Sequence, residues 1–135
     1  MGIENEPISG RTRLVKMLFL ASVDRILSKL VENHIFRCCT YGPYSETIDR
    51  ALNYLVSMGL SKIISMKPTC FNLTDEGLLH AVRHFNQLSN DERNALFMLK
   101  FEYNSMNRCE LLQYIYSSYP EYSRTPIVGR ELFDI

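Results

Sequence analysis

Residues 45–79 read SETIDRALNYLVSMGLSKIISMKPTCFNLTDEGLL, and this stretch decides the fold. Ser45 is a good N-cap, and apolar residues recur behind it at the spacing of a helix. Gly59 suits the left-handed position that ends a helix, and Leu60 supplies the hydrophobic contact of that cap. The pattern therefore predicts a helix over 45–58.

Two short strand-like runs follow this helix. They cover 61–66 and 70–73, and the turn residues at 67–69 separate them. Thr74 then caps a helix that runs to about Leu88. The sequence thus predicts a helix, a hairpin and a second helix in direct succession.

The flanking segments add further elements. Apolar spacing over 11–31 predicts either one long helix or two helices joined near Ser22, with Ser9 or Thr12 available as the cap. Residues 36–41 have strand composition.

Two helices are predicted after Leu88. Ser89 and Glu92 form a capping box at the start of the first, and the second covers roughly 108–119, before Pro120.

These elements predict an α+β fold with a small three-stranded antiparallel sheet and a helical C-terminal extension. The predicted boundaries are a flexible lead over 1–10, a domain over 11–88 and the extension over 89–135, packed as one unit.

The composition excludes several classes of protein. The chain has 135 residues, 46% of them hydrophobic, and a formal net charge of zero, which excludes intrinsic disorder and argues against nucleic-acid coating by bulk charge. Residues 1–72 hold nine basic and six acidic side chains, a net of +3, and residues 73–135 hold the reverse, a net of −3. We therefore expect an anionic partner to meet the first half.

The sequence also predicts the compartment. Four cysteines without paired spacing indicate reduced thiols in the cytoplasm. The apolar run over 14–21 is interrupted by Lys16 and is too short to span a bilayer. A soluble cytoplasmic protein without a membrane partner is expected.

Few residues suggest a catalytic or metal-binding role. His80 and His84 have a metal-capable spacing, but the sequence places no third ligand, so surface histidines are the alternative reading. The chain has no Gly-rich phosphate loop and no nucleophile elbow. We expect no enzyme activity, no metal and no cofactor.

Segments across nearly the whole chain resemble the YwgA-like group of small winged-helix proteins. They are Gly10-Arg11-Thr12-Arg13-Leu14-x-Lys16-x-Leu18-Phe19-Leu20, then Tyr41-Gly42-Pro43-Tyr44-Ser45, and Leu111-Leu112-x-Tyr114-Ile115-Tyr116-x-x-Tyr119-Pro120-Glu121-Tyr122. The chain is more distantly similar to the SocA-type antitoxin domain, and residues 45–79 resemble the wing segment of PadR-like and MarR-like regulators. The resemblance implies a winged helix-turn-helix fold, with 11–88 as the winged-helix domain, and a regulatory or antitoxin-like role. The chain departs from a standard helix-turn-helix in having no clear short helix before Ser45.

In winged-helix proteins the helix enters the major groove and the hairpin tip touches phosphate. Arg50 and Asn53 suit base contacts, since Arg pairs with guanine and Asn with adenine. The carboxylates of Glu46 and Asp49 would repel phosphate. The alternative interpretation of this helix face is an ordinary solvated surface. Tyr44 fits either a hydrophobic staple or a stacking contact. The residues expected to contact phosphate are Arg11, Arg13, Lys16, Lys62 and Lys67, with ordinary solubilising charge as the alternative. The candidate DNA-binding residues are Arg11, Arg13, Lys16, Tyr44, Thr47, Arg50, Asn53, Tyr54, Lys62 and Lys67.

The last third of the chain supplies apolar and Tyr-rich side chains that suit either a homodimer surface or a core. They are Phe97, Met98, Phe101, Leu111, Leu112, Ile115, Tyr116 and Tyr119. The preferred function is a non-enzymatic, dimeric regulator that binds double-stranded DNA. The alternative is a winged-helix module that binds another protein instead.

Overall fold

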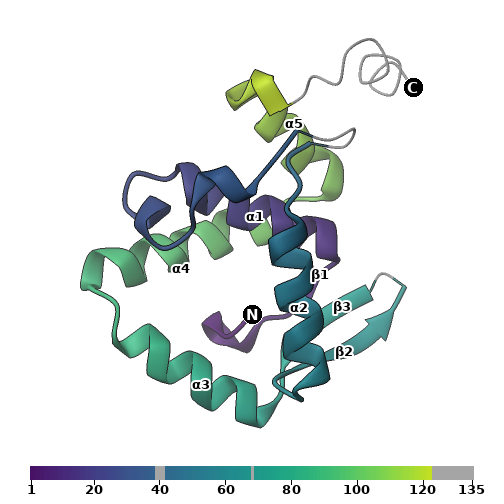
Figure 1. Ribbon diagram of the computed structural model, residues 1–135, viewed down its shortest axis with the longest axis vertical. Coiled ribbons are helices and arrows are strands. Elements are labelled where there is room, and N and C mark those ends of the chain that lie inside the picture. Colours follow the sequence, from purple (N-terminus) through teal and green to yellow (C-terminus); the bar gives the residue numbers. More distant parts are fainter. Residues whose placement is uncertain (39–41, 68, 123–135) are drawn as a thin grey trace.

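The structure is a computed structural model of the chain, and it describes residues 1–38, 42–67 and 69–122 (Figure 1). The helices are α1 (Arg11–Val23), α2 (Glu46–Ser57), α3 (Asp75–Asn86), α4 (Asn90–Asn104) and α5 (Arg108–Ser118). The strands are β1 (Ile8–Ser9), β2 (Ser61–Met66) and β3 (Thr69–Leu73). Short 3-10 helices are η1 (Ile3–Asn5), η2 (Leu27–Lys29), η3 (Asn33–Ile35) and η4 (Pro120–Tyr122). The predicted α+β class and the small antiparallel sheet are confirmed.

The sheet takes its third strand from an unexpected part of the chain. Its order is β1-β3-β2, and Phe71 at its centre pairs with Ile8 on one side and Ile63 on the other. Phe71 is fully buried. β1 has only two residues, which is too short for an alternating pattern to mark it as a strand.

The strand predicted over 36–41 is wrong for residues 36–38, and residues 39–41 lie outside the described part of the chain. Only Arg37 pairs there, through an isolated antiparallel bridge with Tyr44. The edge of β3 that this strand would have used is occupied by β1.

α1 runs through the middle of the molecule and contacts α2, α4, α5 and β1 (Figure 1). Phe19 is fully buried, with its ring edge-on to Phe36 and Tyr119 at centroid distances of 5.5 and 5.4 Å. The helix ends at Val23, so the reading as one long helix is wrong. Its N-cap is Gly10, with φ +97° and no side-chain cap, instead of Ser9 or Thr12.

Part of the predicted dimer surface belongs to the core. Leu111 and Ile115 of α5 are 2% and 0% exposed and pack with Val15 and Phe19 of α1. These two side chains are therefore not available to a second copy. Phe97, Met98 and Phe101 of α4 remain exposed.

Local capping signals place α2, α3 and α4 as the sequence predicts. The Ser45 hydroxyl accepts from the Ile48 N–H, and Gly59 takes the left-handed conformation with φ +71°. Ser89 and Glu92 form the predicted capping box of α4.

Among the helices of the described residues, none combines the length and the apolar character that a membrane span requires.

The first turn of α3 is joined tightly to the turn that follows α2. The Thr74 hydroxyl donates to the Gly59 carbonyl at 2.6 Å and accepts from the Gly77 N–H at 3.1 Å. A Cβ at Gly77 would lie only 1.8 Å from the Leu60 carbonyl oxygen. Only a glycine allows the backbones to approach this closely.

The Gly77→Ala change tests this contact. Helix propensity alone would make the Ala variant more stable by about 1 kcal/mol. A loss of stability would therefore show that the contact with Leu60 outweighs helix propensity. We expect a loss of about 1–3 kcal/mol in the free energy of unfolding, because the methyl group would displace α3 from Leu60. Urea unfolding followed by circular dichroism measures it.

Gly59→Ala is the matched control, since nothing lies within 4 Å of the position where its Cβ would be. Only the left-handed backbone opposes that change, at a cost of about 1 kcal/mol. A Gly77→Ala protein as stable as the original would show that the contact with Leu60 is unimportant.

Candidate nucleic-acid interface

The exposed face of α2 carries four of the predicted site residues. Thr47, Arg50, Asn53 and Tyr54 are all exposed, and the Tyr54 side chain is 60% exposed. Leu52 faces the opposite way and is buried. Apolar residues recur on that inner side, which is why the polar residues between them face solvent.

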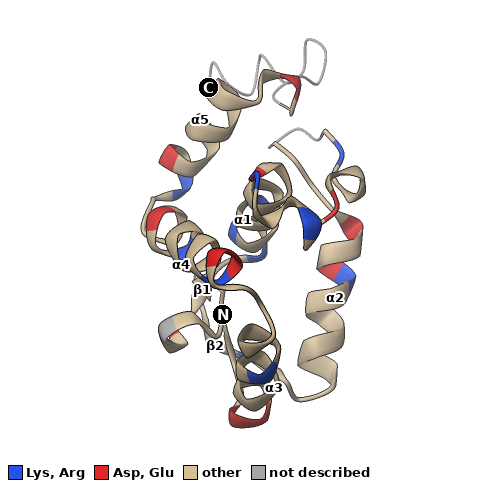
Figure 2. Cartoon of the chain, turned by 90° about the vertical axis from the view of Figure 1, so that its left-hand side faces the viewer, with Lys and Arg blue, Asp and Glu red and all other residues tan. Residues whose placement is uncertain are grey.

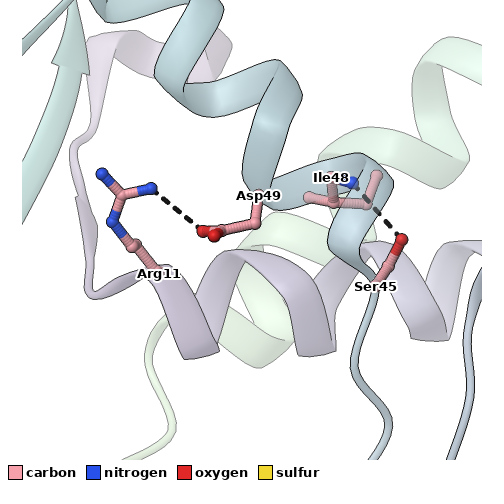
Figure 3. Close-up of polar contacts among 4 residues, drawn as sticks. All are labelled: Arg11, Ser45, Ile48 and Asp49. Carbon is pink, nitrogen blue, oxygen red and sulfur yellow. Dashed lines mark hydrogen bonds and ion pairs between the residues drawn. The ribbon is translucent and has the colours of Figure 1, made fainter.

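Both acidic residues at the start of α2 pair with arginines. Asp49 accepts from Arg11 of α1 at 3.0 Å, and this pair is partly exposed (Figure 3). Glu46 pairs with Arg50 at 3.2 Å, one helical turn away on the exposed face. These pairs reduce the repulsion that the two carboxylates exert on an approaching phosphate. An exposed pair of this kind contributes little, so Arg50 is easily drawn to a new partner.

Arg11 has a structural role besides this pair. Its guanidinium carbon lies 5.3 Å from the centre of the Phe71 ring, in a cation–π arrangement. One side chain thus joins the start of α1 to α2 and to β3. We leave Arg11 out of the phosphate-binding set, because binding phosphate would break these contacts.

Arg13 and Lys16 are also drawn into the fold. Arg13 donates to the backbone oxygens of Tyr103, Asn104 and Met106 at 3.1, 3.4 and 2.6 Å, where α4 ends. Lys16 is only 9% exposed. Both side chains have contacts within the fold, so we leave Arg13 and Lys16 out of the proposed phosphate contacts.

The β2–β3 hairpin, which we call the ribbon, lies beside α2 (Figure 1). It carries two exposed cations, Lys62 on β2 and Lys67 at the turn. A β-bulge interrupts the pairing between Ile63 and Ser65. Bulges increase the local twist of a ribbon.

Apolar side chains accompany these cations. Ile64 and Met66 of β2 are 48% and 70% exposed, and Met58 after α2 is 55% exposed. Large exposed apolar groups on neighbouring elements are typical of a surface that meets another macromolecule.

Arg37 and Tyr44 lie together just before α2. Their backbones form two 2.9 Å hydrogen bonds, and the Arg37 guanidinium carbon lies 5.9 Å from the centre of the Tyr44 ring. Arg37 is exposed, and it is not among the residues predicted from the sequence to bind DNA. Its signal was its place in the strand-like run before the Gly42-Pro43 turn, which brings Arg37 back to Tyr44.

Two 3-10 helices, η2 and η3, lie between α1 and α2. They occupy the part of the chain where a standard helix-turn-helix has its short helix.

The histidines that the sequence suggests as metal ligands do not form a metal site. His80 and His84 are both exposed on α3. In the part of the chain that the structure describes, no group of three His, Cys, Asp or Glu side chains could hold a metal ion. Cys70 lies opposite Ser9 and Ser65 in the sheet, and hydrogen bonds from the side chains of Ser65 and Ser9 lower the pKa of its thiol.

Charges of both signs are interspersed along the helices, as Figure 2 shows for α2 and α4. Arg11, Arg13 and Lys16 lie in contacts within the fold. The excess of positive charge in residues 1–72 is thus not gathered on one basic face.

Replacing Arg13 with leucine tests its structural role. Arg13→Leu removes the donors to the end of α4 and should lower the free energy of unfolding by about 2 kcal/mol. Arg108→Leu, on the exposed start of α5, is the control and should stay within about 0.5 kcal/mol of the original protein. Equal effects of the two changes in urea unfolding would contradict the assignment.

The chain matches no family profile, and comparisons with curated proteins and with solved structures return no significant match.

Proposed function

We propose that the chain is a DNA-binding regulator of the winged-helix type, with α2 as the helix that enters the major groove. The observation that carries the proposal is the exposed polar face of α2 next to the exposed ribbon. The major groove admits one α-helix or one two-stranded ribbon, and the order of helix, ribbon and α3 supports a winged helix.

Arg50 and Asn53 are the proposed base-contacting residues. They lie three residues apart on one exposed face of α2, so they point in similar directions. An Arg side chain donates to both acceptors of guanine, and an Asn amide pairs with adenine. The weak pair with Glu46 leaves Arg50 available for such a contact.

The proposed phosphate contacts are fewer than the sequence predicts. Lys62 and Lys67 of the ribbon are exposed, and Arg37 adds a charge near the start of α2. Arg37, Lys62 and Lys67 thus give three cations for the duplex backbone. Three phosphate contacts support modest, salt-sensitive binding.

A second candidate function is supported by the apolar side chains of the same elements. Tyr54, Met58, Ile64 and Met66 are all about half exposed or more. An aromatic and Met-rich patch is typical of the centre of a protein–protein interface. A winged helix that binds another protein through α2 and the ribbon is therefore the alternative.

Salt dependence separates the two candidates. We expect the affinity for a labelled mixed-sequence duplex to fall about fortyfold between about 50 and 200 mM salt, as for three phosphate contacts. Lys62→Ala with Lys67→Ala should weaken binding to all duplexes alike and reduce the salt slope by about 2. Fluorescence anisotropy measures both quantities.

The matched control is Lys29→Ala with Arg83→Ala, which removes two exposed cations from η2 and α3. This variant should keep the original salt slope. If the original protein fails to bind at the lower salt concentration, DNA binding is excluded and the protein-binding candidate remains.

Sequence preference tests the base contacts. In a selection from random duplexes, Arg50→Ala with Asn53→Ala should abolish enrichment of a preferred sequence, since each bidentate contact gives about 1–3 kcal/mol of discrimination. Arg93→Ala with Asn94→Ala removes the same residue types from α4 and should leave the preference intact. An equal loss of affinity for every sequence from the α2 variant would contradict base contact by this face.

A further inference from the structure

A cavity of about 480 Å³ lies between α3, α4 and the first three residues. Its lining includes Val82 and Phe85 of α3, Leu88 in the turn after α3, and Leu96 and Phe97 of α4. The cavity is open to solvent on one side, where Val82 and Phe97 are 49% and 38% exposed. A volume of this size falls within the range of small-molecule sites, about 300–1,000 Å³.

The two walls are held by separate contacts. The first turn of α3 is fixed to the turn after α2, through Thr74 and the close approach of Gly77 to Leu60. α4 packs against α1, and Arg13 bonds its last carbonyls. Because each helix is positioned by other elements, the space between them does not need to close.

The N-terminal segment is held to α4 by Lys100, which is 3% exposed. Its ammonium donates to the backbone oxygens of Met1, Ile3 and Glu6. The third wall of the cavity is thus also positioned from outside the cavity.

The lining determines which ligand fits. Among the described residues that line the cavity, His84 alone has a polar side chain, and it is exposed to solvent. A charged ligand would lose its hydration there and gain few polar partners. An apolar ligand would recover the dispersion contacts that the lining atoms lack across the open space.

We propose that this cavity binds a neutral, apolar small molecule, such as a compound of one or two aromatic rings. The proposal is independent of DNA binding, since no residue of α2 or the ribbon lines the cavity.

The probe for this site is N-phenyl-1-naphthylamine, a neutral compound that fluoresces in apolar surroundings. The chain contains no Trp, so the background at its emission wavelength is low. We expect saturable binding of one probe molecule per chain. In wild-type protein, the methyl NMR signals of Val82, Leu88 and Leu96 should shift with the probe, and those of Leu52 should not.

Val82→Phe fills the cavity and should weaken probe binding at least tenfold. Leu79→Phe is the matched control, because Leu79 lies on α3, is 70% exposed and does not line the cavity. It should bind the probe as the original protein does. Circular dichroism verifies that both variants fold.

Three outcomes would overturn the proposal. In the first, the two variants bind equally, so the probe adsorbs to exposed apolar surface. In the second, the wild-type methyl signals of Val82, Leu88 and Leu96 stay unchanged. In the third, probe binding falls as the chain dimerises at higher protein concentration, so a second copy occupies the cavity.

Discussion

The burial of α1 is the constraint on which the other features of the structure depend. α1 contacts helices and strands on several sides, and Phe19 at its centre is fully buried. The three cations of α1 make contacts within the fold. Arg13 donates to backbone oxygens at the end of α4, Lys16 is buried, and Arg11 pairs with Asp49 at the edge. Three of the nine cations in residues 1–72 thus stabilise the fold, and the other six include the exposed Arg37, Lys62 and Lys67.

This distribution of charge shapes the candidate interface. With Asp49 paired, α2 presents Arg50 and Asn53 beside uncharged and apolar groups, and the ribbon adds Lys62 and Lys67. The two carboxylates of this surface are paired, and Arg37, Lys62 and Lys67 give it a modest positive charge. Binding here depends on hydrogen bonds and apolar contacts at least as much as on long-range attraction, whichever macromolecule is the partner.

α3 joins the two surfaces for which we propose functions. Its first turn is fixed against Leu60, where α2 gives way to the ribbon, and its later turns form a wall of the cavity. The close approach at Gly77 allows little movement of that first turn, since interiors are closely packed. The shape of the cavity and the position of the ribbon therefore depend on the same helix.

The sequence by itself determined the elements whose signals are local. Ser45, Thr74 and Ser89 each cap a helix through an N–H three residues away, so a short window of sequence is enough to predict α2, α3 and α4. The exposed face of α2 followed from apolar spacing in the same way.

Only the tertiary structure decided which distant segments pair. β1 is the third strand of the sheet, and Arg37 pairs with Tyr44. Arg13 donates to the Tyr103 carbonyl at the end of α4, 90 residues away in the sequence. Leu111 and Ile115 entered the core although their spacing suited a dimer surface equally well. The physical reason is that hydrophobic burial is not directional, so the pattern shows which side chains are buried but not against which element.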